Sequence, residues 1–256
     1  MGVIKIALKL ITPSVREPLS LALAKSHLRV DSTDDDNLIQ GLITAARVHC
    51  EGFQNRAYLQ QTWDLWLDAW PPGDHIDIPL PPLQSVESVK HYGTDDTEYT
   101  FSTDYCDVDD KGFRGRVALK YGVTWPSMTL RPTNGIVIRF VAGYETYAAT
   151  VTTTGTAVAR TAGDEFSTNW TTGKTITIAG TTYRIASVTS ADALVLESTA
   201  GNQVSVAFTA NDVPETIIQA MILHIKLLYD DYPPAERERL ERARDALLWM
   251  ERVGAV

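Results

Sequence analysis

Helical periodicity occupies both ends of this chain, and strand periodicity fills the long stretch between them. Near the start, residues 17–30 and 35–55 place apolar side chains three or four positions apart, as in an amphipathic helix. The same spacing returns in residues 212–231 and 235–252. The chain is therefore expected to be an α+β protein with about four helices.

An acidic run separates the first two expected helices. Pro18 suits the first turn of the first helix, where a missing N–H is tolerated. Residues 31–36 then interrupt the apolar pattern with four aspartates. Carboxylates at a helix start cap free N–H groups and face the positive end of the helix dipole. We interpret the run as a helix start and not as a metal site.

Residues 59–144 change to alternating polar and apolar side chains, which is typical of β-strands. Glycines between the alternating stretches mark turns. The expected strands are residues 61–70, 75–80, 85–91, 99–108, 116–121 and 135–141. This region predicts an antiparallel β-sheet.

Residues 148–210 differ in composition from their neighbours, being rich in threonine with few charges and no proline. Short strands are expected at residues 175–179, 182–188 and 193–196. We predict a small all-β domain inserted into a host domain of residues 1–147 and 211–256. Its two ends should lie close together, as an insertion requires.

The third expected helix begins near Asp212, which could cap it, with Pro214 in its first turn. Apolar side chains surround most of this helix, so it should lie at the centre of the core. Proline residues 233 and 234 end it. The last helix opens with charges of alternating sign, as on a solvated face.

Composition limits the classes of function. The formal net charge of -9 argues against a protein that grips nucleic acid, because phosphate binding needs clustered Lys and Arg. No run of about 18 apolar residues is present, so a membrane span is not expected. Cys50 and Cys106 are expected to be buried thiols without a disulfide framework.

The sequence predicts no catalytic, cofactor-binding or metal-binding residue. Residues 107–112 resemble the start of a calcium loop, but Lys111 takes a ligand position. Residues 173–175 imitate the end of a phosphate loop without its leading glycine. His49 and Cys50 are adjacent on a helix and point about 100° apart. His224 lies in the apolar helix and is interpreted as a core histidine.

Several segments, taken in their order and spacing, resemble one family. Residues 23–30 read Leu-Ala-Lys-Ser-His-Leu-Arg-Val and precede the aspartate cluster at 34–36. The further segments are residues 43–47, 55–57, 61–63, 79–86, 142–144 and 213–215. Together they are similar to the head–tail connector (adaptor) proteins of long-tailed bacteriophages. The threonine-rich segment lies between the last two of these segments, residues 142–144 and 213–215, which are almost adjacent in the family.

The resemblance implies a structural virion protein and not an enzyme. Such subunits form a ring, expected here to be a dodecamer, in the virion neck below the portal protein. A tail-terminator or second neck protein binds the ring, and genomic DNA passes through its lumen during packaging and ejection without sequence-specific contacts. Assembly would take place in the host cytoplasm, with no membrane or cofactor involved.

Two candidate contact surfaces lie in the last helix and the tail. Opposite charges could set the register between subunits, and the residues concerned are Glu236, Arg237, Arg239, Glu241 and Arg242. A monomer would have difficulty burying the apolar groups at the C-terminus, so we expect them to dock on the portal. These groups are Leu248, Trp249, Met250, Val253 and Val256.

Three alternatives remain open at this point. One is a hydrolase that uses paired carboxylates, and another is a tail-terminator, other neck or capsid-decorating protein. The third is a module that binds carbohydrate through Trp170 and Tyr183, although both are better interpreted as the core of a small β-domain.

Overall fold

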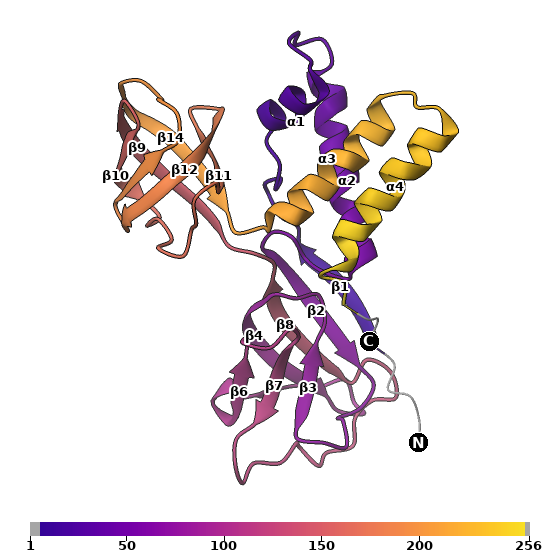
Figure 1. Cartoon of the computed structure of the whole chain (residues 1–256). Helices are drawn as coiled ribbons and strands as arrows, with labels where there is room; N and C mark the ends of the chain where they lie inside the picture. The colour runs from indigo at the N-terminus through magenta and orange to yellow at the C-terminus, as the bar shows by residue number, and fades with distance from the viewer. Residues whose placement is uncertain (1–5, 254–256) are drawn as a thin grey trace. The chain divides into compact units, whose positions relative to one another are not determined.

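The computed structural model of the protein describes residues 6–253, which form two compact units. Unit 1 holds residues up to 16, residues 54–144 and the chain from 252 onward, and unit 2 holds residues 17–53 and 145–251. The described residues form four α-helices, antiparallel sheets and a closed six-stranded barrel (Figure 1). The expected α+β class is confirmed.

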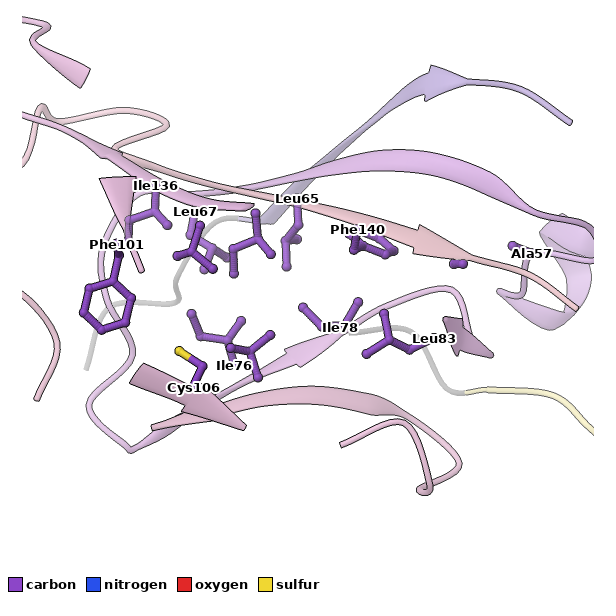
Figure 2. Close-up of a cluster of buried hydrophobic side chains, with 14 residues drawn as sticks. Ala57, Leu65, Leu67, Ile76, Ile78, Leu83, Phe101, Cys106, Ile136 and Phe140 are labelled. Carbon is purple, nitrogen blue, oxygen red and sulfur yellow. The ribbon is translucent and has the colours of Figure 1, made fainter. Parts of the chain in front are cut away.

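Unit 1 is built from two antiparallel sheets, with strand orders β1-β2-β8-β4-β5 and β3-β7-β6. The strands are β1 Ile6–Thr12, β2 Gln61–Leu67, β3 His75–Ile78, β4 Leu83–Tyr92, β5 Glu98–Phe101, β6 Cys106–Asp109, β7 Gly115–Leu119 and β8 Ile136–Ala142. The apolar faces of the two sheets pack on one core, in which Leu65 and Ile138 of the larger sheet join Ile76 and Val117 of the smaller. Figure 2 shows side chains of this core, Leu65 and Ile76 among them, between two layers of strands. Burial of these faces stabilises the unit.

The expected single strand at residues 99–108 is wrong. β5 ends at Phe101, and a 3₁₀ turn, Thr103–Tyr105, follows it. Ser102 starts this turn, because its Oγ accepts a hydrogen bond from the backbone N–H of Asp104 at 3.2 Å. β6 then enters the other sheet, so the turn carries the chain from one layer to the next. The expected strand at 61–70 ends earlier, at Leu67.

Three of the segments that carry the family resemblance meet in unit 1. The backbone N–H of Ala57 donates to the carbonyl oxygen of Pro81 at 3.2 Å, and the guanidinium of buried Arg56 donates to the hydroxyl of Tyr144 at 2.7 Å. Gly143 has a φ of +117°, and a Cβ there would lie 2.1 Å from a backbone oxygen. Because only glycine fits that corner, the motif specifies how the chain folds.

Unit 2 contains the helices, which are α1 Leu21–Leu28, α2 Asp36–Gln54 (Gln54 itself falls in unit 1), α3 Glu215–Tyr229 and α4 Pro234–Trp249. The expected position of Pro18 inside the first helix is wrong. Ser20 is the N-cap, and its Oγ accepts from the backbone N–H of Leu23 at 3.2 Å. Asp36 lies in the first turn of α2, as expected, and accepts from Lys25 Nζ at 2.5 Å.

Helix α3 lies in the core of unit 2, as its sequence predicts. Its buried residues are Ile217, Ile218, Ala220, Met221, Ile222, Ile225 and Leu227. The expected helix start is wrong in detail, because Pro214 is the N-cap residue and makes no side-chain cap. The carboxylate of Asp212 instead accepts from Trp170 Nε1 at 2.7 Å and from the hydroxyl of Tyr147 at 2.8 Å.

Unit 2 also contains the barrel, in the order β10-β13-β12-β11-β14-β9 and closed by pairing of β9 with β10. Its strands are β9 Thr146–Thr154, β10 Ala157–Gly163, β11 Thr175–Ile178, β12 Thr181–Ser190, β13 Ala193–Leu196 and β14 Gln203–Asn211. Thr146 pairs with Asn211, so the chain enters and leaves the barrel side by side. An independent domain at 148–210 remains a prediction.

Candidate subunit and partner interfaces

The outer face of α4 is charged and exposed, as the sequence predicts. Two ion pairs follow the helix at a spacing of four residues, Arg237–Glu241 at 3.2 Å and Glu238–Arg242 at 2.5 Å. Arg239 is exposed on the same helix, as is Glu236 in its first turn. Exposed pairs of this kind contribute little to the stability of one subunit. A role in contact with a second copy therefore remains a prediction.

The C-terminal apolar group does not form one exposed patch. Leu248 is fully buried and Val253 is 3% exposed, so neither side chain is available to a partner. This corrects the expectation that a monomer could not bury them. Trp249 and Met250 are 60% and 73% exposed, and Val256 lies outside the described residues.

The backbone of Val253 is held by hydrogen bonds within unit 1. Its N–H donates to the carbonyl oxygen of Gln54 at 2.9 Å, and its carbonyl oxygen accepts from Asn55 Nδ2 at 2.9 Å. These hydrogen bonds join residues about 200 positions apart in the sequence, both within unit 1. Trp249 packs edge-on against Phe53 with ring centroids 6.1 Å apart, and this contact leaves most of its indole exposed.

A polar cluster of partly exposed side chains joins three helices of unit 2. The rings of His49 on α2 and His224 on α3 stack with centroids 4.1 Å apart. Arg244 on α4 donates to His224 Nδ1 at 2.8 Å and pairs with Asp245. Burial, followed by the charges of His49 and Arg244, lowers the pKa of His224 to about 4. Both rings are therefore neutral near pH 7, and His224 accepts a hydrogen bond from the permanent cation.

Neither cysteine is a reactive nucleophile. Burial raises the pKa of the Cys50 thiol to about 12 and also raises that of Cys106. Since the thiolate is the attacking species, both side chains are unreactive near pH 7. The two thiols are buried and free, as predicted.

The motifs that imitate ligand sites are occupied by internal contacts. Asp109 accepts from the backbone N–H of Lys111 at 3.1 Å and from Arg116 Nε at 2.9 Å. Lys174 reaches the carbonyl oxygen of Val213 at 3.4 Å, and Thr175 begins a strand, where a phosphate loop would begin a helix. Within residues 6–253, no group of three or more His, Cys, Asp or Glu side chains could hold a metal ion.

The aromatic side chains considered for carbohydrate recognition belong to the barrel core. Trp170 is 7% exposed and packs between Phe166 and Phe208. Tyr183 is half-buried and packs against the same cluster. Stacking on a sugar needs an open ring face, and Trp170 does not offer one.

A third exposed surface was not predicted, and it lies on strand β1. Ile6, Leu8 and Leu10 are 40%, 39% and 41% exposed. Their alternation around Lys9 is the strand period of two. This alternation was the signal available in the sequence, and no strand was predicted there. Separately, no described helix is both long and apolar enough to span a membrane.

Comparisons with known proteins give one family and one fold. Residues 18–100 match the family described as phage gp6-like head-tail connector protein. A similar solved chain comes from the neck of an empty gene transfer agent (GTA) particle computed with C6 symmetry. Its TM-score is 0.58 and its identity is 18%, and the match covers 98% of this chain and 97% of that one. Among curated proteins, none matches this chain significantly in sequence.

Two further solved chains share the fold. One is from the virion of a native gene transfer agent (GTA) particle, with a TM-score of 0.55, 19% identity and coverage of 97% and 96%. The other is from a native GTA neck computed with C12 symmetry, with a TM-score of 0.53, 18% identity and coverage of 98% and 97%. Coverage this high includes residues of the barrel. The resemblance of this chain to head–tail connector proteins is thus confirmed by sequence over residues 18–100, and nearly the whole chain shares its fold with chains of GTA particles.

Proposed function

We propose that this chain is a structural subunit of the neck of a phage-like particle, where it joins the capsid to the tail and catalyses no reaction. The match of residues 18–100 to the gp6-like head–tail connector family carries the proposal. The shared fold with chains of particle necks supports the location at the head–tail interface. Subunits would be assembled in the host cytoplasm before they join the particle.

The subunits form a closed ring of twelve below the portal. A neck that contains this fold was computed with C12 symmetry and another with C6 symmetry. Sixfold symmetry is contained in twelvefold symmetry, so both agree with such a ring. A ring requires a heterologous contact, in which two different faces of the subunit meet. The charged face of α4 is one candidate for such a face.

Genomic DNA passes through the lumen of this ring during packaging and ejection. The formal net charge of -9 suits that passage. A protein that binds duplex DNA tightly neutralises many phosphates with Lys and Arg, whereas an acidic lining repels them. The assembled ring should therefore retain no DNA fragment in a gel-shift assay at physiological salt.

Trp249 and Met250 contact the portal in this proposal, because they are the exposed members of the C-terminal group. Exposed tryptophans often dominate the energy of an interface. The double variant Trp249→Ala, Met250→Ala should weaken portal binding by about 1–3 kcal/mol and retain the fold. Tyr121→Ala is a matched control, since this exposed aromatic lies in unit 1. Unchanged binding of the double variant would reject portal contact through these residues.

A pull-down distinguishes this function from its alternatives. The full chain should retain the portal protein and a tail-terminator or second neck protein. Retention of the capsid protein alone would identify a capsid-decorating protein and contradict the proposal. Retention of the tail-tube protein without the portal would indicate a tail-terminator.

A further inference from the structure

Strand β1 is one of the two edges of the larger sheet. It pairs with β2 on one side, and no described strand pairs with its other side. Natural edge strands are usually short, charged or covered, because their free backbone groups invite another strand. β1 has seven residues, IALKLIT, and Lys9 is its one charged residue. Its free backbone and apolar composition are typical of a strand that pairs in an assembly.

The exposed side chains of β1 continue the core face of the sheet. In the register of β1 and β2, Leu8 lies opposite Leu65 and Ile6 lies opposite Leu67. Opposite residues of an antiparallel pair point to the same face. Leu65 and Leu67 are buried in the core of unit 1, whereas the residues on β1 are about two-fifths exposed. The apolar face of the sheet therefore extends beyond its cover in the single subunit.

The opposite edge of the sheet, β5, presents aromatic groups on the same face. Tyr99 lies opposite His91 in the register with β4, and Phe101 lies opposite the core residue Val89. Tyr99 is 42% exposed and stacks on His91 with centroids 5.5 Å apart. One edge of the core face is thus aliphatic, and the other is aromatic.

The outer faces of the two edges carry opposite charges. Lys9 alternates with the apolar side chains of β1, so it lies on the other face of the sheet, where it is exposed. Glu98 occupies the same outer face at β5, held by Lys90 Nζ and by the hydroxyl of Tyr92, each at 2.7 Å. If these edges met, apolar groups would lie beside apolar groups, and a lysine would approach a carboxylate.

We propose that β1 of one subunit adds to β5 of the next copy of this chain, so that the sheet continues across the subunit boundary. This inference rests on the proposed ring and names its contact. The two edges are different strands, so the contact is heterologous and propagates around a ring. A contact between two β1 strands would be isologous and would stop at a dimer. The successive strands from β1 to β5 are antiparallel, so the added strand runs parallel to β5.

Engineered cysteines test the contact in assembled rings. Leu8→Cys and Tyr99→Cys place one thiol on the core face at each edge. Rings of the double variant, formed on the portal and verified by electron microscopy, are oxidised and separated on a denaturing gel. The native Cys50 and Cys106 are buried and serve as an internal background. A ladder of cross-linked multimers is expected from the double variant, and monomers from each single variant.

The outcomes separate this inference from the function on which it rests. Intact rings without a ladder would overturn the β1–β5 contact and leave the ring in place. Dimers from Leu8→Cys alone would show a β1–β1 contact, which would also overturn the β1–β5 contact. Absence of rings from the unmodified protein mixed with its portal would overturn the proposed function itself.

Discussion

The barrel of unit 2 has no edge strand, whereas the larger sheet of unit 1 has two. Every barrel strand pairs on both sides, so that β9, for example, contacts both β10 and β14. In the larger sheet, β1 and β5 each pair on one side among the described strands. Closure removes the free backbone groups that promote association. The barrel therefore has no open edge, whereas the described strands leave the sheet with two.

Exposed apolar side chains follow the same division. Residues 146–211 are all described, and Val204 is the one large apolar side chain that is strongly exposed among them. Unit 1 exposes a row of three on β1 and an aromatic group on β5. Free backbone and exposed apolar surface therefore coincide in unit 1. We therefore expect the contacts between subunits at the sheet edges and not on the barrel.

The largest expected effect comes from the two cores. Phe140 in unit 1 and Phe208 in the barrel are fully buried. Each substitution by alanine should lower the free energy of unfolding by about 3–5 kcal/mol, measured by calorimetry. Phe140→Ala should lower the transition of unit 1, and Phe208→Ala that of the barrel. Identical shifts of one shared transition would show that the two regions unfold as a single cooperative unit.

The next effect concerns the exposed row on β1. Leu8→Lys places a charge in the proposed contact and should reduce each subunit contact by about 1.5–3 kcal/mol, at least tenfold in affinity. Ring formation on the portal, counted by electron microscopy, should fall accordingly. Val204→Lys is the matched control on the closed barrel and should assemble normally. Normal assembly of Leu8→Lys, or failure of Val204→Lys to assemble, would contradict a subunit contact at β1 that excludes the barrel.

Acid should affect the helices of unit 2 more than the barrel, which has no histidine in residues 146–211. The pKa of His224 is lowered to about 4 from an ordinary value of about 6.5. The unfolded chain binds more protons between these values, so this contribution to stability is full above pH 6.5 and is lost as pH falls toward 4. Because the ring is partly exposed, we expect about 1–2 kcal/mol.

Urea unfolding at acidic and neutral pH measures this contribution. His224→Gln retains a group that can accept from Arg244 and does not titrate, so its stability should decline less over that pH window. His75→Gln is the control, because His75 is exposed in unit 1. An equal loss of stability in the His224 variant and the parent would contradict the role of His224 in the pH dependence.

The smallest effect is expected on the charged face of α4. Arg239→Glu should change the free energy of unfolding of the subunit by less than about 0.5 kcal/mol, as exposed substitutions do. If this face lies in the ring contact, ring assembly of the variant should weaken at low salt and recover as salt screens the charges. An assembly curve identical to that of the parent at every salt concentration would exclude this face.

Local pattern was sufficient for much of the fold. The apolar spacing of α3 predicted its central place, and three barrel strands were found from their alternation. β1, β9, β10 and β14 were missed. β9 and β14 mix threonine with small apolar residues, so their alternation is weak, and the alternation of the β1 segment is short, with Lys9 as its only charged residue.

The candidate surfaces were predicted less well, because their exposure depends on distant contacts. Val253 is buried, and its backbone is hydrogen-bonded to Gln54 and Asn55, about 200 residues away in the sequence. Nothing in the composition of the C-terminal segment distinguishes buried Val253 from exposed Met250 nearby. Leu8 is exposed because β1 lies at a sheet edge. That position depends on which strands pair, and local sequence does not specify the pairing.

Electron cryomicroscopy of the full chain bound to its portal tests the central claim most directly. We expect a closed ring of twelve subunits on the portal axis, with β1 of each subunit beside β5 of the next and the barrel outside that contact. A ring joined only through the barrel would contradict our account of the sheet edges. Isolated subunits or twofold dimers on the portal would contradict the connector function itself.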